Sequence, residues 1–278
     1  MRKIDKPTYN TKKIVNECSE SFRDKTKREN YQKSAIFIAT ESDSYDKLAI
    51  KQSLYKIKPH NKVNSILTAS DMEKLYSDKF AKHASVRPKY YDKIMVSSAG
   101  RCPICGVGVV SNLDHYLAKS IYPTYAVTPT NLIPICRDCN YNKSDTKIDS
   151  ITSAPFHPYY DSIDNIEWLV AKLQVANGQI VAQYSVNEEI ELYNADLYNR
   201  LCNHFDVYKL NKVYGVQSSA EIADNYRQWK DNYNTWGKKY LLRFLEQQLN
   251  SCEIYQKNTW KTALLRAFLN NITLLKRI

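Results

Sequence analysis

Apolar residues recur at helical spacing in one part of the chain and at strand spacing in another, and the two patterns predict different elements. Over 71–80 they fall every three or four positions, which predicts an amphipathic helix with Ser70 as its N-cap. The apolar face of this helix would consist of Met72, Leu75, Tyr76 and Phe80. Strand-forming residues over 107–113 predict a strand, and a short helix is expected from Cys139 to about Asp145.

Two further apolar segments, 168–175 and 180–186, flank the dipeptide Asn177-Gly178. Both residues tolerate positive φ, so the pair predicts a β-hairpin. Helices are expected over about 188–205, 218–250 and 258–276. The second of these helices carries aromatic residues at three- and four-residue steps, and we expect them to pack into a core: Tyr226, Trp229, Tyr233, Trp236, Tyr240 and Phe244.

These patterns divide the chain into three sections. Residues 1–97 are basic and mostly helical, and the first 30 are polar enough to be partly disordered. Residues 98–160 hold paired cysteines, and residues 161–278 form a β-hairpin followed by helices. The expected fold class is α+β, with a small central core between a mostly helical N-terminal section and the hairpin-plus-helix C-terminal section.

Composition and charge limit the classes of molecule that the protein is expected to bind. The 278 residues are 43% hydrophobic and 25% charged, which is typical of an ordinary soluble protein. Of the formal net charge of +11, residues 1–97 supply +9, as 21 Lys and Arg against 12 Asp and Glu. Such a surface attracts polyanions, of which nucleic acid is the commonest, although a plain solubility charge would have the same sign.

The N-terminal residues do not form the apolar run of a signal peptide. No stretch of the sequence approaches the roughly 18 apolar residues of a membrane span. We therefore expect no membrane partner and a cytoplasmic location, where thiols stay reduced.

Four of the seven cysteines form two Cys-x2-Cys pairs: Cys102, Cys105, Cys136 and Cys139. In a reducing compartment this spacing predicts metal binding rather than disulfides. Four thiolates make the closed tetrahedral site of a structural Zn²⁺, with no open position for water. The single cysteines are expected to be ordinary core or surface residues: Cys18, Cys202 and Cys252.

Polar residues suited to phosphodiester chemistry lie between and just after these pairs. Asp114 precedes His115 near the end of the expected strand, Asn131 follows in the same section, and Asn140 comes directly after the last cysteine. A neutral imidazole can take a proton from an attacking water, and a carboxylate is a hard ligand for Mg²⁺. Taken singly, each of these residues is more often structural than catalytic.

Together, Asp-His, then Asn, then Cys-Asn-x-x-Lys within a double Cys-x2-Cys frame resembles the HNH endonuclease family, which has a ββα-metal (His-Me finger) fold. The resemblance implies His115 as general base and Asp114 and Asn140 as ligands of a catalytic Mg²⁺ or Mn²⁺. It also implies that Asn131 fixes the loop carrying His115, and that Lys143 faces phosphate or holds the site together. Asparagine at 140, where the family often has its last histidine, is a familiar variant.

The motif resemblance covers about 100–160, with Ala118 in a loop position where related sequences usually have proline. Two further segments, 156–161 and 258–266, resemble standalone HNH nucleases of bacterial anti-phage systems, some of which act beside an ATPase partner (Septu and retron-associated types). The resemblance therefore implies a defence effector with a candidate ATPase partner. His157, in the first segment, would contact phosphate, support His115 or buttress the section boundary.

The implied activity is DNA hydrolysis that leaves a 5′-phosphate and a 3′-hydroxyl. Basic residues near the motif would grip the backbone: Arg101, Lys119, Arg137 and Lys147. RNA cleavage by the same chemistry stays open, because nothing in the sequence identifies a reader of the 2′-hydroxyl. A non-catalytic zinc-ribbon module that binds nucleic acid also stays open, although it would not need Asp114, His115 and Asn140 together.

Overall fold

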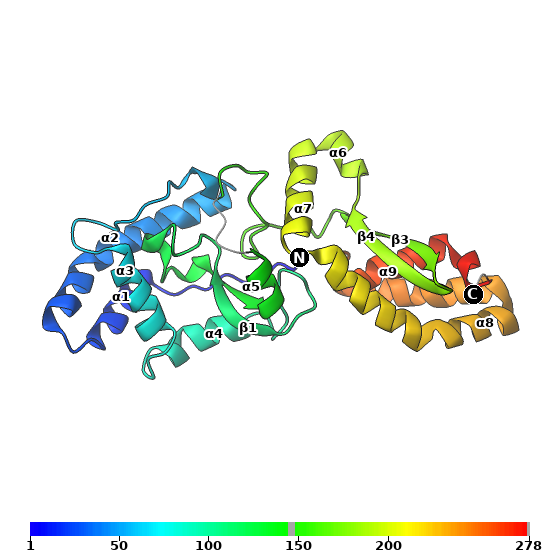
Figure 1. Cartoon of the computed structure of the whole chain (residues 1–278), viewed down its shortest axis with the longest axis horizontal. Coiled ribbons are helices and arrows are strands. Elements are labelled where there is room, and N and C mark those ends of the chain that lie inside the picture. The colour runs from blue at the N-terminus through cyan, green and yellow to red at the C-terminus, as the bar shows by residue number, and fades with distance from the viewer. Residues whose placement is uncertain (144–147, 277–278) are drawn as a thin grey trace. The chain divides into compact units, whose positions relative to one another are not determined.

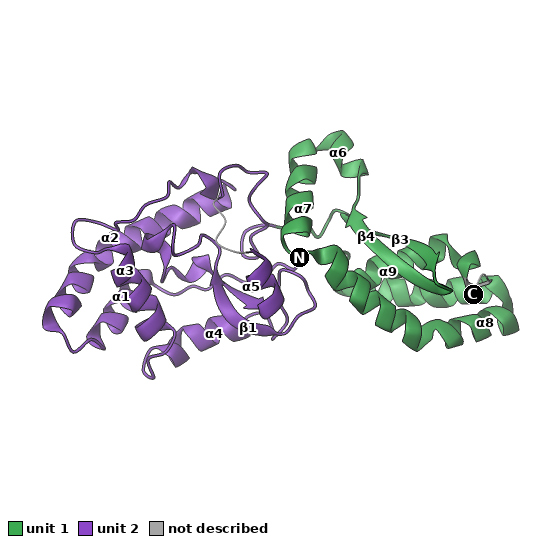
Figure 2. Cartoon of the chain, in the orientation of Figure 1, with its two compact units in different colours: residues 1, 162–278 green, residues 2–161 purple. Residues whose placement is uncertain are grey.

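The protein is described from a computed structural model, which covers residues 1–143 and 148–276. The chain forms two compact units: residues 2–161 make one, and Met1 with residues 162–278 makes the other (Figure 2). Each unit combines helices with a two-stranded antiparallel sheet, so the protein is α+β. The first two predicted sections therefore lie within one compact unit.

The first unit begins with helices and then carries a small sheet (Figure 1). Its helices and strands, in chain order, are α1 (Thr11–Glu20), α2 (Lys25–Ile50), α3 (Ala69–Lys74), α4 (Tyr91–Val96), β1 (Val110–His115), β2 (Leu132–Cys136) and α5 (Arg137–Lys143). The strand predicted over 107–113 lies slightly further along the chain, as β1. The helix predicted from Cys139 begins at Arg137, and its predicted end at Asp145 falls outside the described residues.

The expectation of partial disorder over the first 30 residues is wrong, because α1 and the start of α2 occupy this segment. Asn10 caps α1 by accepting a hydrogen bond from the N–H of Lys13 at 2.9 Å. Asp24 caps α2 in the same way, from the N–H of Lys27 at 3.1 Å. The polar sequence hides a narrow apolar stripe on α1, and its packing stabilises the helix: Ile14, Val15 and Cys18.

The predicted helix over 71–80 is present, but it begins earlier and changes geometry. Thr68 rather than Ser70 is the N-cap, and it forms a capping box with Asp71. After α3 the chain continues as a π-helical turn (Leu75–Phe80). The predicted apolar face is buried, as expected: Met72, Leu75, Tyr76 and Phe80.

The N-terminal helices and the sheet share one hydrophobic core. Ile38 of α2 and Phe80 of the π-helical turn belong to the same buried cluster as Leu113 of β1 and Leu132 of β2. Because this core crosses the boundary between the predicted sections 1–97 and 98–160, the N-terminal helices brace the sheet instead of forming a separate domain.

β1 and β2 pair antiparallel, and α5 follows β2 without a connecting loop. His115 lies opposite Leu132, and Val110 lies opposite Cys136, with a register shift between Val110 and Asn112. α5 packs against both strands. α5 therefore begins beside the start of β1, and Lys143 at its other end reaches the end of β1.

The second unit contains β3 (Leu169–Ala176), β4 (Gln179–Val186), α6 (Glu189–Tyr193), α7 (Ala195–Val207), α8 (Leu210–Tyr255) and α9 (Trp260–Asn270). The hairpin prediction is confirmed: Asn177 and Gly178 connect β3 to β4 with φ of 50° and 73°. The helix predicted over 188–205 is two helices, α6 and α7. The helix predicted over 258–276 ends at Asn270 and is followed by a 3-10 turn (Ile272–Lys276).

α8 is interrupted at Gly237, whose φ of 82° and ψ of 173° are accessible essentially to glycine alone. Trp229 before the break and Leu241 after it are buried in one core with Phe268 of α9. The expectation that the aromatic stripe packs into a core is therefore right for Trp229, and Tyr226, Tyr233 and Phe244 pack half-buried against that core. It is wrong for Trp236 and Tyr240, which are 66% and 48% exposed. Although α8 spans 46 residues, no helix in the described ranges is long and apolar enough to cross a membrane.

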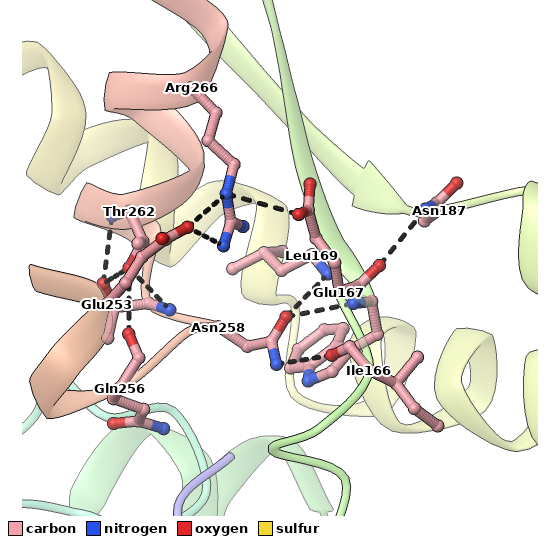
Figure 3. A network of polar contacts seen from close by, with 11 residues as sticks. Ile166, Glu167, Leu169, Asn187, Glu253, Gln256, Asn258, Thr262 and Arg266 are labelled. Atoms are coloured by element: carbon pink, nitrogen blue, oxygen red, sulfur yellow. Dashed lines mark hydrogen bonds and ion pairs between the residues drawn. The ribbon is translucent and has the colours of Figure 1, made fainter. Parts of the chain in front are cut away.

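Polar contacts tie α9 to the start of the hairpin (Figure 3). The Asn258 side chain accepts hydrogen bonds from the N–H groups of Trp168 and Leu169 at 3.0 and 3.4 Å, and donates to the carbonyl of Ile166 at 2.7 Å. Arg266 of α9 forms ion pairs with Glu253 and Glu167 (Figure 3). The segment 258–266 therefore begins and ends with residues that hold the second unit together.

Candidate metal centre and active site

The paired cysteines converge on one point. Their Sγ atoms all lie within 4.8 Å of one another, and those of Cys105 and Cys136 are 3.9 Å apart. Zn–S bonds of about 2.3 Å in a tetrahedron separate neighbouring sulfurs by about 3.8 Å. The buried cluster could therefore hold a structural metal such as zinc, through all four predicted ligands: Cys102, Cys105, Cys136 and Cys139.

Thiols this close together change each other's protonation. Hydrogen bonds from the other three thiols lower the pKa of Cys105, and the matching contacts raise the pKa of Cys139. One thiolate is stabilised at the expense of its neighbours, so all four can ionise together only beside a cation. The donor set thus fits a divalent metal better than four free thiols.

Two glycines shape the turn around Cys105. Gly106 has a φ of 71°, and its N–H donates to the carbonyl of Cys102 at 2.8 Å. The N–H of Gly108 donates to the Sγ of Cys105 at 3.3 Å. A Cβ at Gly108 would lie 2.6 Å from both the Cβ and the Sγ of Cys136, whereas a Cβ at Gly106 would meet nothing within 4 Å. The positive φ therefore requires glycine at 106, and the close approach to a metal ligand requires it at 108.

Gly108→Ala is expected to weaken metal binding more than Gly106→Ala. The added methyl group at 108 must displace the Cys136 ligand, while the one at 106 only strains the backbone. We expect zinc affinity to fall at least about tenfold in Gly108→Ala, a typical cost of disturbing a metal ligand. Chelator competition followed by metal analysis measures this, and equal zinc retention by the two variants would contradict the packing argument.

Asp114 and His115 end β1, and Lys143 of α5 reaches both of them. The Lys143 Nζ lies 2.6 Å from an Asp114 carboxylate oxygen and also donates to the main-chain carbonyl of His115. Asn140 lies three residues before Lys143, so both occupy the same face of α5. These contacts fasten α5, which carries Cys139 and Asn140, to β1, which carries the candidate base His115.

The His115 ring is held in one tautomer. Within the described part of the chain, its single hydrogen bond joins Nε2 to the carbonyl oxygen of Ala126 at 2.9 Å. Because a carbonyl can only accept, Nε2 carries the proton and the neutral ring keeps its lone pair on Nδ1. The ring is only 5% exposed and packs edge-on against Tyr76, with centroids 4.4 Å apart.

Burial lowers the pKa of His115 to about 4, against the opposing effects of the Ala126 hydrogen bond and the Asp114 charge. An unfolded histidine has a pKa of about 6.5, so below that pH the unfolded chain binds a proton that the folded chain refuses. The free energy of unfolding should therefore fall, by on the order of 3 kcal/mol, as the pH drops from about 6.5 to 4.

Denaturant unfolding over this pH range, with His115→Asn as the comparison, measures the effect. The variant lacks the titrating ring, so its stability should change less with pH than that of the wild type. Acid release of any bound metal affects both proteins and cancels in the comparison. Parallel pH profiles would show that the ring is not kept neutral by burial.

Asn131 fastens the loop between β1 and β2. Its side chain accepts from the N–H of Leu117 at 2.8 Å and donates to the carbonyls of Leu117 and Tyr125, both at 3.1 Å. Tyr125 precedes Ala126, whose carbonyl holds the His115 ring. These contacts are the ones that a loop-fixing role requires.

His157 lies in a buried cluster of tyrosines and is only 2% exposed. Its Nδ1 accepts from the N–H of Tyr159 at 3.3 Å, and its Nε2 shares a hydrogen bond with the Tyr45 hydroxyl at 3.1 Å. The ring also packs against Tyr116, the residue after His115, with centroids 4.3 Å apart. Both nitrogens of the His157 ring are engaged by tyrosines of this cluster, so the geometry favours the buttressing alternative over phosphate contact.

The predicted backbone-gripping residues differ in their surroundings. Arg101 and Arg137 are exposed, whereas the Lys119 Nζ lies 2.8 Å from Glu73 of α3. Lys147 lies outside the described residues. Tyr141, which the sequence analysis did not single out, is 82% exposed on α5, next to Asn140.

Sequence reasoning missed the residues that reach the site from α2 and the π-helical turn. Tyr76, identified only as a core residue, packs on the His115 ring. Glu41 and Asp46 of α2 accept hydrogen bonds from the loop hydroxyls of Tyr125 and Thr130, at 3.3 and 2.6 Å. No local sequence pattern predicts such contacts, because each joins residues that are far apart in the chain.

Comparisons with known proteins give one informative similarity. No protein-family model matches the chain, and no solved structure matches it. The chain is similar to Protein ea31 of Escherichia phage lambda, with 26% identity over 262 residues. The alignment covers 90% of this chain and 87% of the phage protein, so the likeness extends over both compact units.

Proposed function

We propose that this protein is a divalent-metal-dependent HNH endonuclease that hydrolyses phosphodiester bonds in DNA. The observation that carries the proposal is the His115 ring, which is neutral, fixed in one tautomer by Ala126 and adjacent to the Asp114 carboxylate. Further support comes from the order of β1, β2 and α5 beside the four-cysteine cluster, which is the order expected of a ββα-metal core with a structural zinc.

In the proposed reaction His115 accepts a proton from the attacking water at Nδ1. The Ala126 carbonyl keeps the ring orientation through its bond to Nε2–H, and the Asp114 carboxylate stabilises the positive charge that the ring gains. A pKa of about 4 is low for a base acting near neutral pH. The negative charge of a bound phosphate would raise the pKa of the ring toward the useful range.

Asp114 and Asn140 would hold the catalytic Mg²⁺ or Mn²⁺. Both offer hard oxygen donors, and the reach of Lys143 from the same face of α5 to Asp114 supports their proximity. When bound, the divalent cation supplies charge stabilisation at the scissile phosphate and the leaving oxygen. Lys143 keeps α5 against the end of β1 and places a further positive charge beside the phosphate position.

The substrate and the biological setting are further parts of the proposal. The net charge of +11 supports a polyanionic substrate, and the exposed Arg101 and Arg137, each next to a cysteine of the cluster, would supply backbone contacts. The resemblance to standalone HNH nucleases supports a role as an anti-phage effector with an ATPase partner. Both proposals depend on nuclease activity and are tested after it.

The testing experiment incubates the purified protein with plasmid DNA and with total RNA, in parallel, with Mg²⁺, with Mn²⁺ or with a chelator. We expect metal-dependent nicking or degradation of DNA that leaves 5′-phosphate ends, detectable by religation. Cleavage of RNA alone would reassign the substrate but keep the chemistry. Binding of both polymers without cleavage of either would favour the non-catalytic zinc-ribbon alternative.

A further inference from the structure

The break in α8 leaves two large aromatic side chains outside the core of the second unit. Trp236 directly precedes Gly237 and is 66% exposed, and Tyr240 is 48% exposed. Their ring centroids lie 6.0 Å apart, with 39° between the ring planes. Trp229 and Leu241 already supply the buried contacts of this helix, so the two exposed rings are not needed for packing.

Positively charged residues lie close to the two rings in the sequence. The segment 232–245 contains three cationic residues and no carboxylate, and all three cations are exposed: Lys238, Lys239 and Arg243. Among the described residues none of the three takes part in an ion pair: Asp231, before the segment, lies 4.0 Å from Arg227, and no ion pair joins Glu246, after it, to any of the three. The surface therefore combines flat apolar faces with unneutralised positive charge.

We propose that this surface, made by Trp236, Lys238, Lys239, Tyr240 and Arg243, binds single-stranded nucleic acid. Exposed aromatic rings stack with unpaired bases, and nearby lysines and arginines contact the phosphates between them. A duplex would use only the cations, because its bases are already stacked on one another. The inference deepens the proposed function, on which it rests, by assigning a single-stranded segment of the substrate to the second compact unit.

Charge favours nucleic acid over a protein as the occupant. Lysine is depleted in the buried centres of protein interfaces, whereas here two exposed lysines lie between the two aromatic residues in the sequence. The same unit carries a useful contrast on α6, where Leu192 and Tyr193 are 87% and 67% exposed. That pair follows three glutamates at 188, 189 and 191, so it should repel a polyanion.

The test uses the full-length protein without added Mg²⁺ or Mn²⁺, so that binding is measured without cleavage. A fluorescently labelled single strand of about 16 nucleotides and the matching duplex are titrated by anisotropy. Trp236→Ala should weaken single-strand binding at least about tenfold, and Trp236→Phe, which keeps a stacking ring, should weaken it much less. Tyr193→Ala is the matched control and should bind like the wild type.

Two further readouts separate stacking from charge. Single-strand binding should quench tryptophan fluorescence in the wild type, and Trp236→Phe should lose most of this signal, since Trp168 and Trp229 are fully buried and Trp260 packs half-buried against the core. Replacing both Lys238 and Lys239 by glutamine should reduce the salt dependence of binding. Circular dichroism confirms that the variants, changed at exposed positions, keep their helices.

Unchanged single-strand affinity in Trp236→Ala, or an equal loss in Tyr193→Ala, would overturn the proposal. A surface used only for a protein partner would give this same unchanged affinity. The result is independent of catalysis: a protein that binds single strands through Trp236 but cleaves nothing would sink the nuclease proposal alone. One that cleaves DNA with unchanged Trp236→Ala binding would sink this inference alone.

Discussion

Cys136→Ser is expected to release the structural metal and to destabilise the first compact unit. Structural zinc contributes on the order of 10 kcal/mol in small metal-folded units, which is comparable with the whole stability of a domain. Cys136 ends β2 and directly precedes α5. Loss of its thiolate therefore removes the metal link between these two elements and the turn around Cys105. The unit also has a hydrophobic core that includes α1 and α2. We therefore expect only partial loss of structure, and a decrease of several kcal/mol in the free energy of unfolding.

Metal analysis should find about one zinc per wild-type chain, as four thiolates form one tetrahedral site, and much less in Cys136→Ser. At about 2–4 °C per kcal/mol, the melting temperature of the first unit should fall by roughly 10 °C. Cys252→Ser, which alters a half-buried cysteine outside the cluster, is the matched control. Full zinc content and an unchanged melting temperature in Cys136→Ser would show that the cluster is not a metal site.

His115→Ala is expected to lower the rate of DNA cleavage by about 10²- to 10⁴-fold, the usual contribution of a general base. The ring offers Nδ1 as its proton acceptor, and alanine offers none. Initial rates on plasmid DNA, at saturating Mg²⁺ or Mn²⁺, measure the loss. Zinc content should be unchanged, because His115 is not part of the four-cysteine cluster.

His83→Ala is the matched control for this measurement. His83 is half-buried and bonds the nearby Ser85 hydroxyl, so its replacement should leave the cleavage rate close to that of the wild type. Wild-type rates in a folded His115→Ala protein would remove His115 from the role of base. Equal losses in the two histidine variants would point to lost stability instead of lost chemistry.

The sequence predicts those parts of the fold whose signals are local. Asn177-Gly178 predicts the hairpin because the turn itself requires positive φ at both residues. The two Cys-x2-Cys pairs predict that the four thiols lie together, because four ligands can bind one metal ion only when they surround it. The helical spacing of apolar residues over 71–80 predicts a buried face, made by Met72, Leu75, Tyr76 and Phe80.

Other features depend on contacts that no short segment encodes. The order of α1 in a polar sequence comes from a narrow apolar stripe that packs against α2 and the π-helical turn, and the sequence therefore suggested disorder. The break at Gly237 turns Trp236 away from the core although its spacing matches that of Trp229. Periodicity alone assumes one continuous helix, and here it fails at the residue that interrupts the helix.

The candidate site shows the same division. Asp114, His115, Asn131 and Lys143 could be named from the motif, and Lys143 does contact Asp114. The carbonyl of Ala126, the ring of Tyr76 and the α2 carboxylates could not be named, because they reach the loop only through the tertiary fold. The close contact of Gly108 with Cys136 could not be predicted from the sequence either, since it depends on how closely the two Cys-x2-Cys segments approach each other.

The central claim is that His115 and a cation held by Asp114 and Asn140 act on one phosphate. Its most direct test is a crystal structure of the protein with Mn²⁺ and a short oligonucleotide, in which anomalous scattering locates the manganese. The account predicts manganese within about 2.2 Å of oxygens from both Asp114 and Asn140, with the phosphate between it and Nδ1 of His115. Manganese bound elsewhere, or a phosphate beyond the reach of His115, would contradict it.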